Sequence, residues 1–188
     1  IARSTGLSAQ TVSVIMRALE ADGLLLRGAP KKGRVGQPSV PMSLNPNGAY
    51  SIGLKIGRRS ADLVLMDFVG TILKRLHETY AYPAPAAILQ FVRSGVETLT
   101  CDLDAEALKR VAGIGMAVPF ELWNWVEEAG ASQADSDAWR EFDLLAEVAE
   151  LVPFPVFMEN DATSACGAEL VFGLGSQYPD FIYFFVGS

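Results

Sequence analysis

Two adjacent polar residues, Asn160 and Asp161, stand where a run of strand-forming residues gives way to a run of small, helix-forming ones. A carboxamide beside a carboxylate offers donors and acceptors to neighbouring hydroxyl groups, and a carboxylate within hydrogen-bond reach of a hydroxyl can take its proton. The pair is therefore a candidate for binding a polyhydroxylated ligand, or for catalysis with Asp161 as the general base. Both residue types are also strong helix N-caps, so a purely structural role stays open.

A second candidate region begins at Pro119 and Phe120 and carries three tryptophans, Trp123, Trp125 and Trp139. Aromatic faces can stack on the C–H surface of a sugar, and nearby acidic residues can accept hydrogen bonds from its hydroxyls. Tryptophans also pack lids and subunit contacts. The sequence leaves the binding role and the packing role equally open.

The elements that must position these residues follow a turn cluster at Asn45–Gly48. Three strand-like runs come first, then a helix, and then strands that alternate with helices. This order predicts an α/β fold with helices on the faces of a mixed sheet. His77 lies in the third run, an expected edge strand, and is expected to be solvated. The expected strands are Tyr50–Ile56, Ala61–Phe68, Thr71–Tyr80, Val111–Val118, Pro155–Met158 and Ile182–Val186, and the expected helices are Ala86–Cys101 and Ala162–Phe172.

The first part of the chain predicts a different unit. Gly6 ends a short helix, Ser8 caps a second one, and Asp22-Gly23 ends it. Two helices joined by a glycine turn, then a hairpin with a basic tip rich in Gly and Pro, form the pattern of a winged helix-turn-helix. A helical hairpin with a solvated basic loop is the simpler alternative. In the DNA-binding interpretation, the residues expected on base edges or phosphates are Ser8, Gln10, Thr11 and Ser13, and those expected mostly on phosphates are Arg17, Lys31, Lys32 and Arg34.

The distribution of charge divides the chain in the same place. Residues 1–45 carry six basic and two acidic side chains, a net charge of +4, whereas the remainder carries nine basic and twenty acidic ones. A basic segment on an acidic body, within a total charge of −7, indicates that the segment meets a polyanion and the body does not. We predict a DNA-binding domain over residues 1–46 and a second domain over residues 47–188.

The composition restricts the class of protein. Half of the 188 residues are hydrophobic and a fifth are charged, as expected for a packed core. No apolar run approaches the ~20 residues of a membrane-spanning helix, and the first residues do not form a signal peptide. Two cysteines make neither a disulfide framework nor a zinc motif. We expect a cytoplasmic protein without a membrane partner, and a fragment that is incomplete at both ends.

Three stretches resemble the ROK family, which contains repressors, sugar-sensing proteins and sugar kinases. They are GIGMAVPF (113–120), PVFMENDATSACGAELVFGLG (155–175) and DFIYFFVGS (180–188). The resemblance implies half of an actin-like sugar-kinase fold, and the helix-turn-helix before it resembles the family's repressor branch. A sugar-responsive transcriptional repressor is then expected, with operator DNA, a sugar or sugar phosphate and a second copy of the chain as partners.

The resemblance also implies roles for single residues. Asn160 would hydrogen-bond sugar hydroxyls, Asp161 would match the general base of the family's kinases, and Pro119 with Phe120 would border the sugar. Family members usually carry Gly where this chain has Phe120, which leaves the identity of the sugar open. The family's zinc motif would lie beyond residue 188, so no metal or other cofactor is expected in this span.

One stretch departs from the family's kinases. Where their first strand carries an aspartate and then small residues, this chain has Lys55 and then Arg58-Arg59. Phosphoryl transfer needs a phosphate cradle and a carboxylate-held Mg²⁺, and a lysine cannot hold magnesium. We therefore expect sugar binding without phosphorylation. The alternatives are an ATP- and Mg²⁺-dependent sugar kinase with Asp161 as its base, and a regulator that senses a protein partner.

Overall fold

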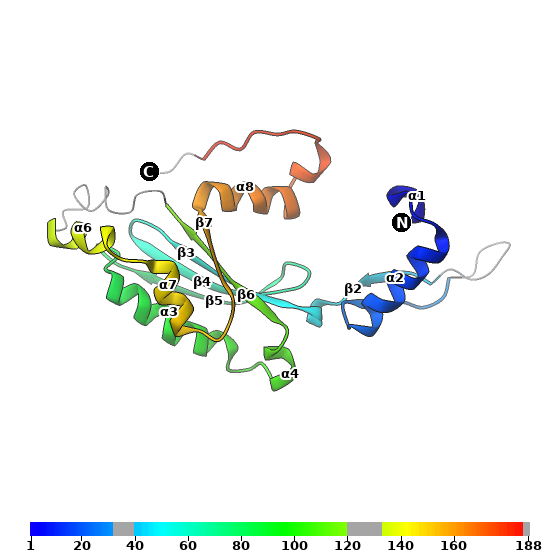
Figure 1. Cartoon of the computed structure of the whole chain (residues 1–188), viewed down its shortest axis with the longest axis horizontal. Coiled ribbons are helices and arrows are strands. Elements are labelled where there is room, and N and C mark those ends of the chain that lie inside the picture. Colours follow the sequence, from blue (N-terminus) through cyan, green and yellow to red (C-terminus); the bar gives the residue numbers. More distant parts are fainter. Residues whose placement is uncertain (32–39, 120–132, 186–188) are drawn as a thin grey trace.

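A computed structural model describes residues 1–31, 40–119 and 133–185 of the chain (Figure 1). Within these residues the strands form two separate sheets, one of two strands and one of five. The N-terminal helices and the two-stranded sheet lie at one end of the molecule, and the five-stranded sheet with its helices lies at the other. We call residues 1–44 the N-terminal segment, residues 45–48 the joint and residues 49–185 the body.

The N-terminal segment starts with two helices, α1 (Ala2–Thr5) and α2 (Ala9–Ala21). Gly6 ends α1 in the left-handed conformation, at φ 69°, which glycine adopts without strain. The Ser8 side chain accepts a hydrogen bond from the backbone N–H of Thr11 at 3.1 Å and so caps α2. The helix, glycine turn and capped second helix predicted from the sequence are confirmed.

The two-stranded sheet packs beside α2. Its strands, β1 (Leu25–Arg27) and β2 (Met42–Leu44), are antiparallel. An ion pair of 2.6 Å between Arg27 and Glu20 links β1 to the end of α2. Between the strands, the expected wing tip with Lys32 and Arg34 lies outside the described residues.

The five-stranded sheet is mixed, with the strand order β5-β4-β3-β6-β7. Its first three strands form an antiparallel meander, whereas β6 runs parallel to β3 and β7 runs parallel to β6. Gly70, at φ 88°, makes the tight turn between β4 and β5. The mixed sheet expected from the sequence is confirmed. Its strands are β3 (Tyr50–Ile56), β4 (Ser60–Asp67), β5 (Ile72–Thr79), β6 (Val111–Val118) and β7 (Val156–Asn160).

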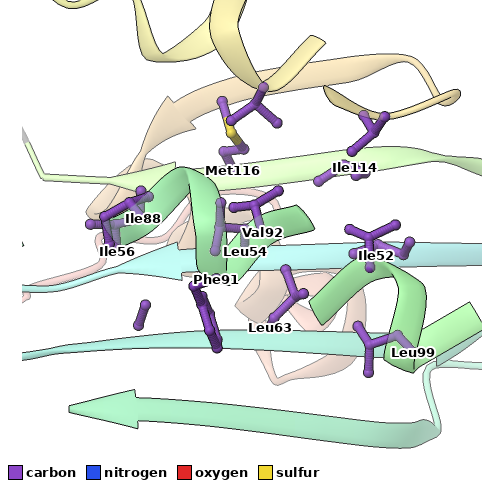
Figure 2. Close-up of a cluster of buried hydrophobic side chains, with 14 of the residues drawn as sticks. Ile52, Leu54, Ile56, Leu63, Ile88, Phe91, Val92, Leu99, Ile114 and Met116 are labelled. Carbon is purple, nitrogen blue, oxygen red and sulfur yellow. The ribbon is translucent and has the colours of Figure 1, made fainter. Parts of the chain in front are cut away.

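Helices cover both faces of this sheet: α3 and α7 lie on one face and α8 on the other (Figure 1). Alternate residues of β3 and β4 are buried, so these strands present one apolar face, which packs against α3 (Figure 2). The body's helices are α3 (Pro85–Thr100), α4 (Ala105–Leu108), α6 (Gln133–Arg140), α7 (Leu144–Leu151) and α8 (Asp161–Phe172), and short 3-10 turns cover Pro46–Gly48 and Gly175–Gln177.

One glycine allows α3 to lie close to the sheet. A Cβ added at Gly95 would lie 2.6 Å from Cδ2 of Leu63, a side chain that is fully buried in β4. Because Gly95 has no side chain, the helix backbone approaches the sheet more closely than a larger residue would permit. Glycine at position 95 therefore allows α3 and β4 to pack without a gap at this point in the core.

One expected strand is wrong. Residues 182–185, the described part of the expected strand Ile182–Val186, form no strand, and Ile182 and Phe184 are 79% and 83% exposed. A strand exists only where a neighbouring strand accepts its hydrogen bonds, and β7 is the edge of the sheet. His77 is exposed on the edge strand β5, as expected, and its Nδ1 also lies 2.9 Å from a carboxylate oxygen of Asp62.

Candidate functional site

The carboxyl ends of the three parallel strands meet at one edge of the five-stranded sheet. The strand register places Lys55 of β3 beside Ala117 of β6, and Val118 of β6 beside Asn160 of β7. Ligands of open α/β sheets bind in the crevice outside the carboxyl ends of the strands. The topology therefore brings the Asn160–Asp161 pair and Pro119 to the edge where a ligand is expected.

Asn160 caps the helix that follows it. Its Oδ1 accepts hydrogen bonds from the backbone N–H groups of Ala162 at 3.0 Å and of Thr163 at 3.3 Å. The Asp161 Oδ1 accepts a further one, from Ala162 at 2.8 Å. The capping role left open by the sequence is therefore real, and it explains why α8 begins where β7 ends.

The cap uses only part of each side chain. Within the described part of the chain, Nδ2 of Asn160 and Oδ2 of Asp161 make no hydrogen bond. Both residues are half-buried. One amide donor and one carboxylate acceptor thus remain at the strand ends, held in place by a capped helix. That is the minimum needed to bind two neighbouring hydroxyl groups.

Of the second candidate region, Pro119 is buried directly after β6, while Phe120, Trp123 and Trp125 lie outside the described residues. Trp139 is 4% exposed, and its indole N–H donates to the carbonyl of Pro83 at 2.7 Å. Its ring also meets that of Phe142 edge to face at 5.5 Å. Trp139 therefore packs in the core. Of the two roles that the sequence leaves open, this tryptophan has the packing role.

Three basic residues that stood out in the sequence lie at the end of β3 and in the turn after it. Lys55, Arg58 and Arg59 are exposed, and among the described residues Lys55 makes no ion pair. The turn is held by Tyr80, whose hydroxyl donates to the carbonyl of Gly57 at 2.8 Å. Burial raises the pKa of the Tyr80 hydroxyl far above its usual range, so this group stays a hydrogen-bond donor at physiological pH.

The carboxylate nearest to Lys55 in the sheet is already engaged. Asp62 of β4 stands opposite Lys55, and its Oδ1 accepts from Arg75 at 2.7 Å and lies 2.9 Å from Nδ1 of His77. In the described residues, no three His, Cys, Asp or Glu side chains gather to hold a metal ion. A site made of a lysine and an aspartate that is already paired with an arginine offers no free carboxylate to a cation that prefers oxygen ligands, such as Mg²⁺.

The residues expected to contact DNA at the cap of α2 and within the helix are exposed. Two of them engage each other, since the hydroxyl oxygens of Ser8 and Thr11 are 2.8 Å apart. Two bond back to the helix, Ser13 to the carbonyl of Ala9 at 2.9 Å and Arg17 to the carbonyl of Ser13 at 3.2 Å. Gln10 and Lys31 are exposed as well, whereas Lys32 and Arg34 lie outside the described residues.

Two sets of residues are not found by reading the sequence. Asp62, Arg75 and His77 come together only through the register of β4 and β5, which their spacing alone does not show. Arg110 contacts a residue 88 positions away in the chain. No local pattern marks either set.

Among the helices of the described residues, none combines the length and the apolar composition that a membrane span requires.

The sheet order, the meander, the parallel strands and the helices on both faces define the class: an actin-like, sugar-kinase-like α/β fold. Residues 51–188 match the model of the ROK family. The chain belongs to the ROK family. Solved structures similar to it include a ROK family transcriptional regulator, a homologue of the E. coli MLC protein. The two chains superpose with a TM-score of 0.59 and are 19% identical, and the match covers 91% of this chain and 43% of that one.

Two further comparisons bear on the fold and the family. A ROK family glucokinase from Streptomyces griseus, solved with glucose and AMPPNP, has a TM-score of 0.51 and 23% identity over 68% of this chain and 38% of its own. A xylose repressor from Bacillus spizizenii is 25% identical over 97% of this chain and 47% of its own length. The chain thus spans about half the length of the curated relative it matches.

Proposed function

We propose that this chain belongs to a sugar-responsive transcriptional repressor whose body binds a sugar or sugar phosphate without phosphorylating it. One observation carries the proposal. The Asn160–Asp161 pair lies at the carboxyl ends of the parallel strands with one amide donor and one carboxylate oxygen left over from the helix cap, and Lys55 lies at the same end of β3, beside Ala117 of β6. This supports a site that binds hydroxyl groups and has a lysine where a magnesium-binding carboxylate would be needed for phosphoryl transfer.

DNA binding by the N-terminal segment is part of the proposal. It is supported by the exposed polar residues on the first turns of α2 and by the net charge of +4 on residues 1–45. Helix-turn-helix proteins bind as dimers to two half-sites, so a second copy of the chain is the proposed partner on DNA. The relative from Bacillus spizizenii is a xylose repressor, which makes D-xylose the first effector to test.

A sugar kinase is the second candidate, and Asp161 favours it. Its Oδ2 is the carboxylate oxygen that a general base needs, and it makes no hydrogen bond within the described residues. The cations at the end of β3 and in the turn after it argue against ATP-dependent transfer, because Mg²⁺ requires oxygen ligands. A regulator that senses a protein partner is a third candidate, and it predicts no sugar binding at all.

One experiment separates the three candidates. The full-length protein is titrated by calorimetry with a panel of sugars and sugar phosphates, D-xylose among them, and the same mixtures are assayed for phosphorylated product with ATP and Mg²⁺. We expect binding of at least one sugar, weakened in Asp161→Asn, with no product. Turnover that disappears in Asp161→Asn identifies a kinase, and a parent protein that binds no sugar of the panel contradicts the proposed function and supports a protein sensor.

A further inference from the structure

Arg110 bonds the body to the N-terminal segment. It lies between α4 and β6, and its Nη1 donates to the carbonyl of Asp22 at 3.3 Å and to the carbonyl of Gly48 at 3.1 Å. Asp22 ends α2, and Gly48 ends the joint. A single side chain of the body therefore reaches both the end of the proposed recognition helix and the residues that connect it to the sheet. We call these two hydrogen bonds the Arg110 contact.

Gly23 makes room for the Arg110 contact, and Gly48 allows the joint to lie close to both units. Gly23 has φ 75°, and a Cβ placed there would lie 2.9 Å from Nη2 of Arg110. A Cβ on the buried Gly48 would lie 3.2 Å from the carbonyl oxygen of Gly23 and 3.2 Å from the ring of Phe68. The N-terminal segment thus approaches the body closely here, backbone against guanidinium and ring. This close approach gives the segment a defined orientation, unlike a flexible linker.

The joint also makes hydrogen bonds of its own to the N-terminal segment and to the body. The Asn45 side chain donates to the carbonyl of Gly23 at 2.7 Å, and the backbone N–H of Phe68 donates to the carbonyl of Pro46 at 3.0 Å. These bonds tie the joint to each unit separately. Among the described residues, the side-chain hydrogen bond between the body and the N-terminal segment is the one that Arg110 donates to Asp22.

The same residue connects to the candidate sugar site through two strands. The carbonyl of Arg110 accepts a hydrogen bond from the N–H of Tyr50, the first residue of β3, at 2.9 Å. The next residue, Val111, begins β6. β3 and β6 are parallel neighbours. Both begin beside Arg110, and their carboxyl ends carry Lys55 and Pro119. Strands of this length span about 25 Å, so the Arg110 contact and the sugar site lie at opposite ends of one stiff pair.

We propose that the Arg110 contact sets the orientation of the N-terminal segment on the body, and that ligand binding at the carboxyl ends of β3 and β6 changes DNA affinity by making or breaking this contact. Arg110 is exposed and its hydrogen bonds are at the long end of the usual range. The contact can therefore open without leaving a buried charge unpaired. The role in orientation stands independently, whereas the role in coupling rests on the proposed function.

Orientation is tested by pulsed electron resonance on the full-length protein. Its native cysteines are replaced by serine, spin labels are attached at Ala18→Cys on α2 and Glu97→Cys on α3, and labelled chains are diluted with unlabelled ones. We expect one narrow distance peak in the parent and loss of that peak in Arg110→Ala. Arg93→Ala, an exposed arginine of α3, is the matched control and keeps the peak. An unchanged peak in Arg110→Ala overturns the role in orientation.

A second variant guards against a folding defect. Gly23→Ala places a methyl group against the guanidinium while residue 110 remains an arginine, and we expect it to lose the narrow peak too. Thermal unfolding of both variants shows whether the body is intact. If Arg110→Ala unfolds early, and Gly23→Ala is folded but keeps the narrow peak, the role in orientation is wrong.

Coupling is tested with operator DNA and D-xylose as the probe. We expect the sugar to change the operator affinity of the parent by a factor of about 5 to 150, the usual range of allosteric coupling, and to change that of Arg110→Ala by less than about twofold. An equal response in parent and variant overturns the role in coupling. A parent that binds the operator but ignores every sugar contradicts the proposed function, and the coupling role falls with it, while the spin-label measurement still decides the role in orientation.

Discussion

Asn160 performs two tasks with two different atoms. Its Oδ1 caps α8 through Ala162 and Thr163, and its Nδ2 is left at the strand ends. The side chain thus links the start of a helix to the candidate site, and any ligand bound to Nδ2 is held as rigidly as the helix itself. The cap and the ligand contact can be separated because aspartate and asparagine cap helices equally well.

We therefore predict different outcomes for two substitutions of Asn160. Asn160→Ala removes the cap and should lower the free energy of unfolding by about 0.5–2 kcal/mol. Asn160→Asp keeps the cap, so its stability should stay near that of the parent, but it replaces the Nδ2 donor and should weaken sugar binding about tenfold. Denaturant unfolding and calorimetry measure the two effects. If Asn160→Asp binds sugar like the parent, Asn160 is only a cap.

Asp62 gives the sheet a dependence on pH. Burial alone pushes the pKa of its carboxyl upward, but hydrogen bonds from Arg75 and His77 outweigh burial, and the pKa lies below its ordinary value. A carboxyl whose pKa is lower in the folded state stabilises the protein above the unfolded-state pKa of about 3.9. That contribution is lost as the pH falls through the folded-state pKa.

The prediction for Asp62→Asn follows from the lowered pKa of the Asp62 carboxyl in the folded state. At pH 7 the parent should be more stable than the variant, by no more than about 1 kcal/mol because the pair is partly exposed. The difference should shrink as the pH falls below the unfolded-state pKa of about 3.9. Urea unfolding of both proteins between neutral pH and pH 3 measures it. Parallel curves with a constant gap would show that the carboxylate charge contributes nothing.

At the scale of the elements, two glycines in helices have opposite surroundings. A Cβ at Gly95 of α3 would press on Leu63, whereas a Cβ at Gly167 of α8 would meet nothing within 4 Å. Alanine favours a helix over glycine by about 1 kcal/mol, but overpacking a core costs about 1–3 kcal/mol. The same substitution should therefore change stability in opposite directions at the two sites.

We predict that Gly95→Ala lowers the free energy of unfolding by about 1 kcal/mol and that Gly167→Ala raises it by up to about 1 kcal/mol. The two variants serve as controls for each other, because both add one methyl group to a helical glycine. Denaturant midpoints compared at equal slopes give the answer. A gain in stability in both would mean that α3 does not lie against β4 as closely as the structure has it.

How far the sequence predicts the fold can be judged from single elements. The strands Tyr50–Ile56 and Val111–Val118 are predicted at both ends, because the first alternates apolar residues with small or polar ones and the second is an apolar run before a proline. The expected strand from Ile182 is wrong, because the apolar run shows the propensity of a strand but not whether a partner strand exists. Asn160 and Asp161 stand out because they break such a run, whereas Arg110 acquires its role only from a contact 88 residues away.

At the scale of the whole molecule, the two proposed functions lie at opposite ends of the same strands. The candidate sugar site is at the carboxyl ends of β3, β6 and β7, and the Arg110 contact is at the amino ends of β3 and β6. The N-terminal segment extends from the second of these ends (Figure 1). An arrangement of this kind lets one event at the candidate sugar site change the position of the helices proposed to bind DNA, without a hinge inside the sheet.

The most direct test of this account is the operator affinity of the full-length protein, with and without sugar and with no ATP present. The operator is selected from random DNA, and fluorescence anisotropy follows its binding as D-xylose and the other sugars of the panel are added. The account predicts specific binding and a change in affinity of about fivefold or more with at least one sugar. It is contradicted if the protein binds no DNA sequence specifically, or if its operator affinity is the same with every sugar.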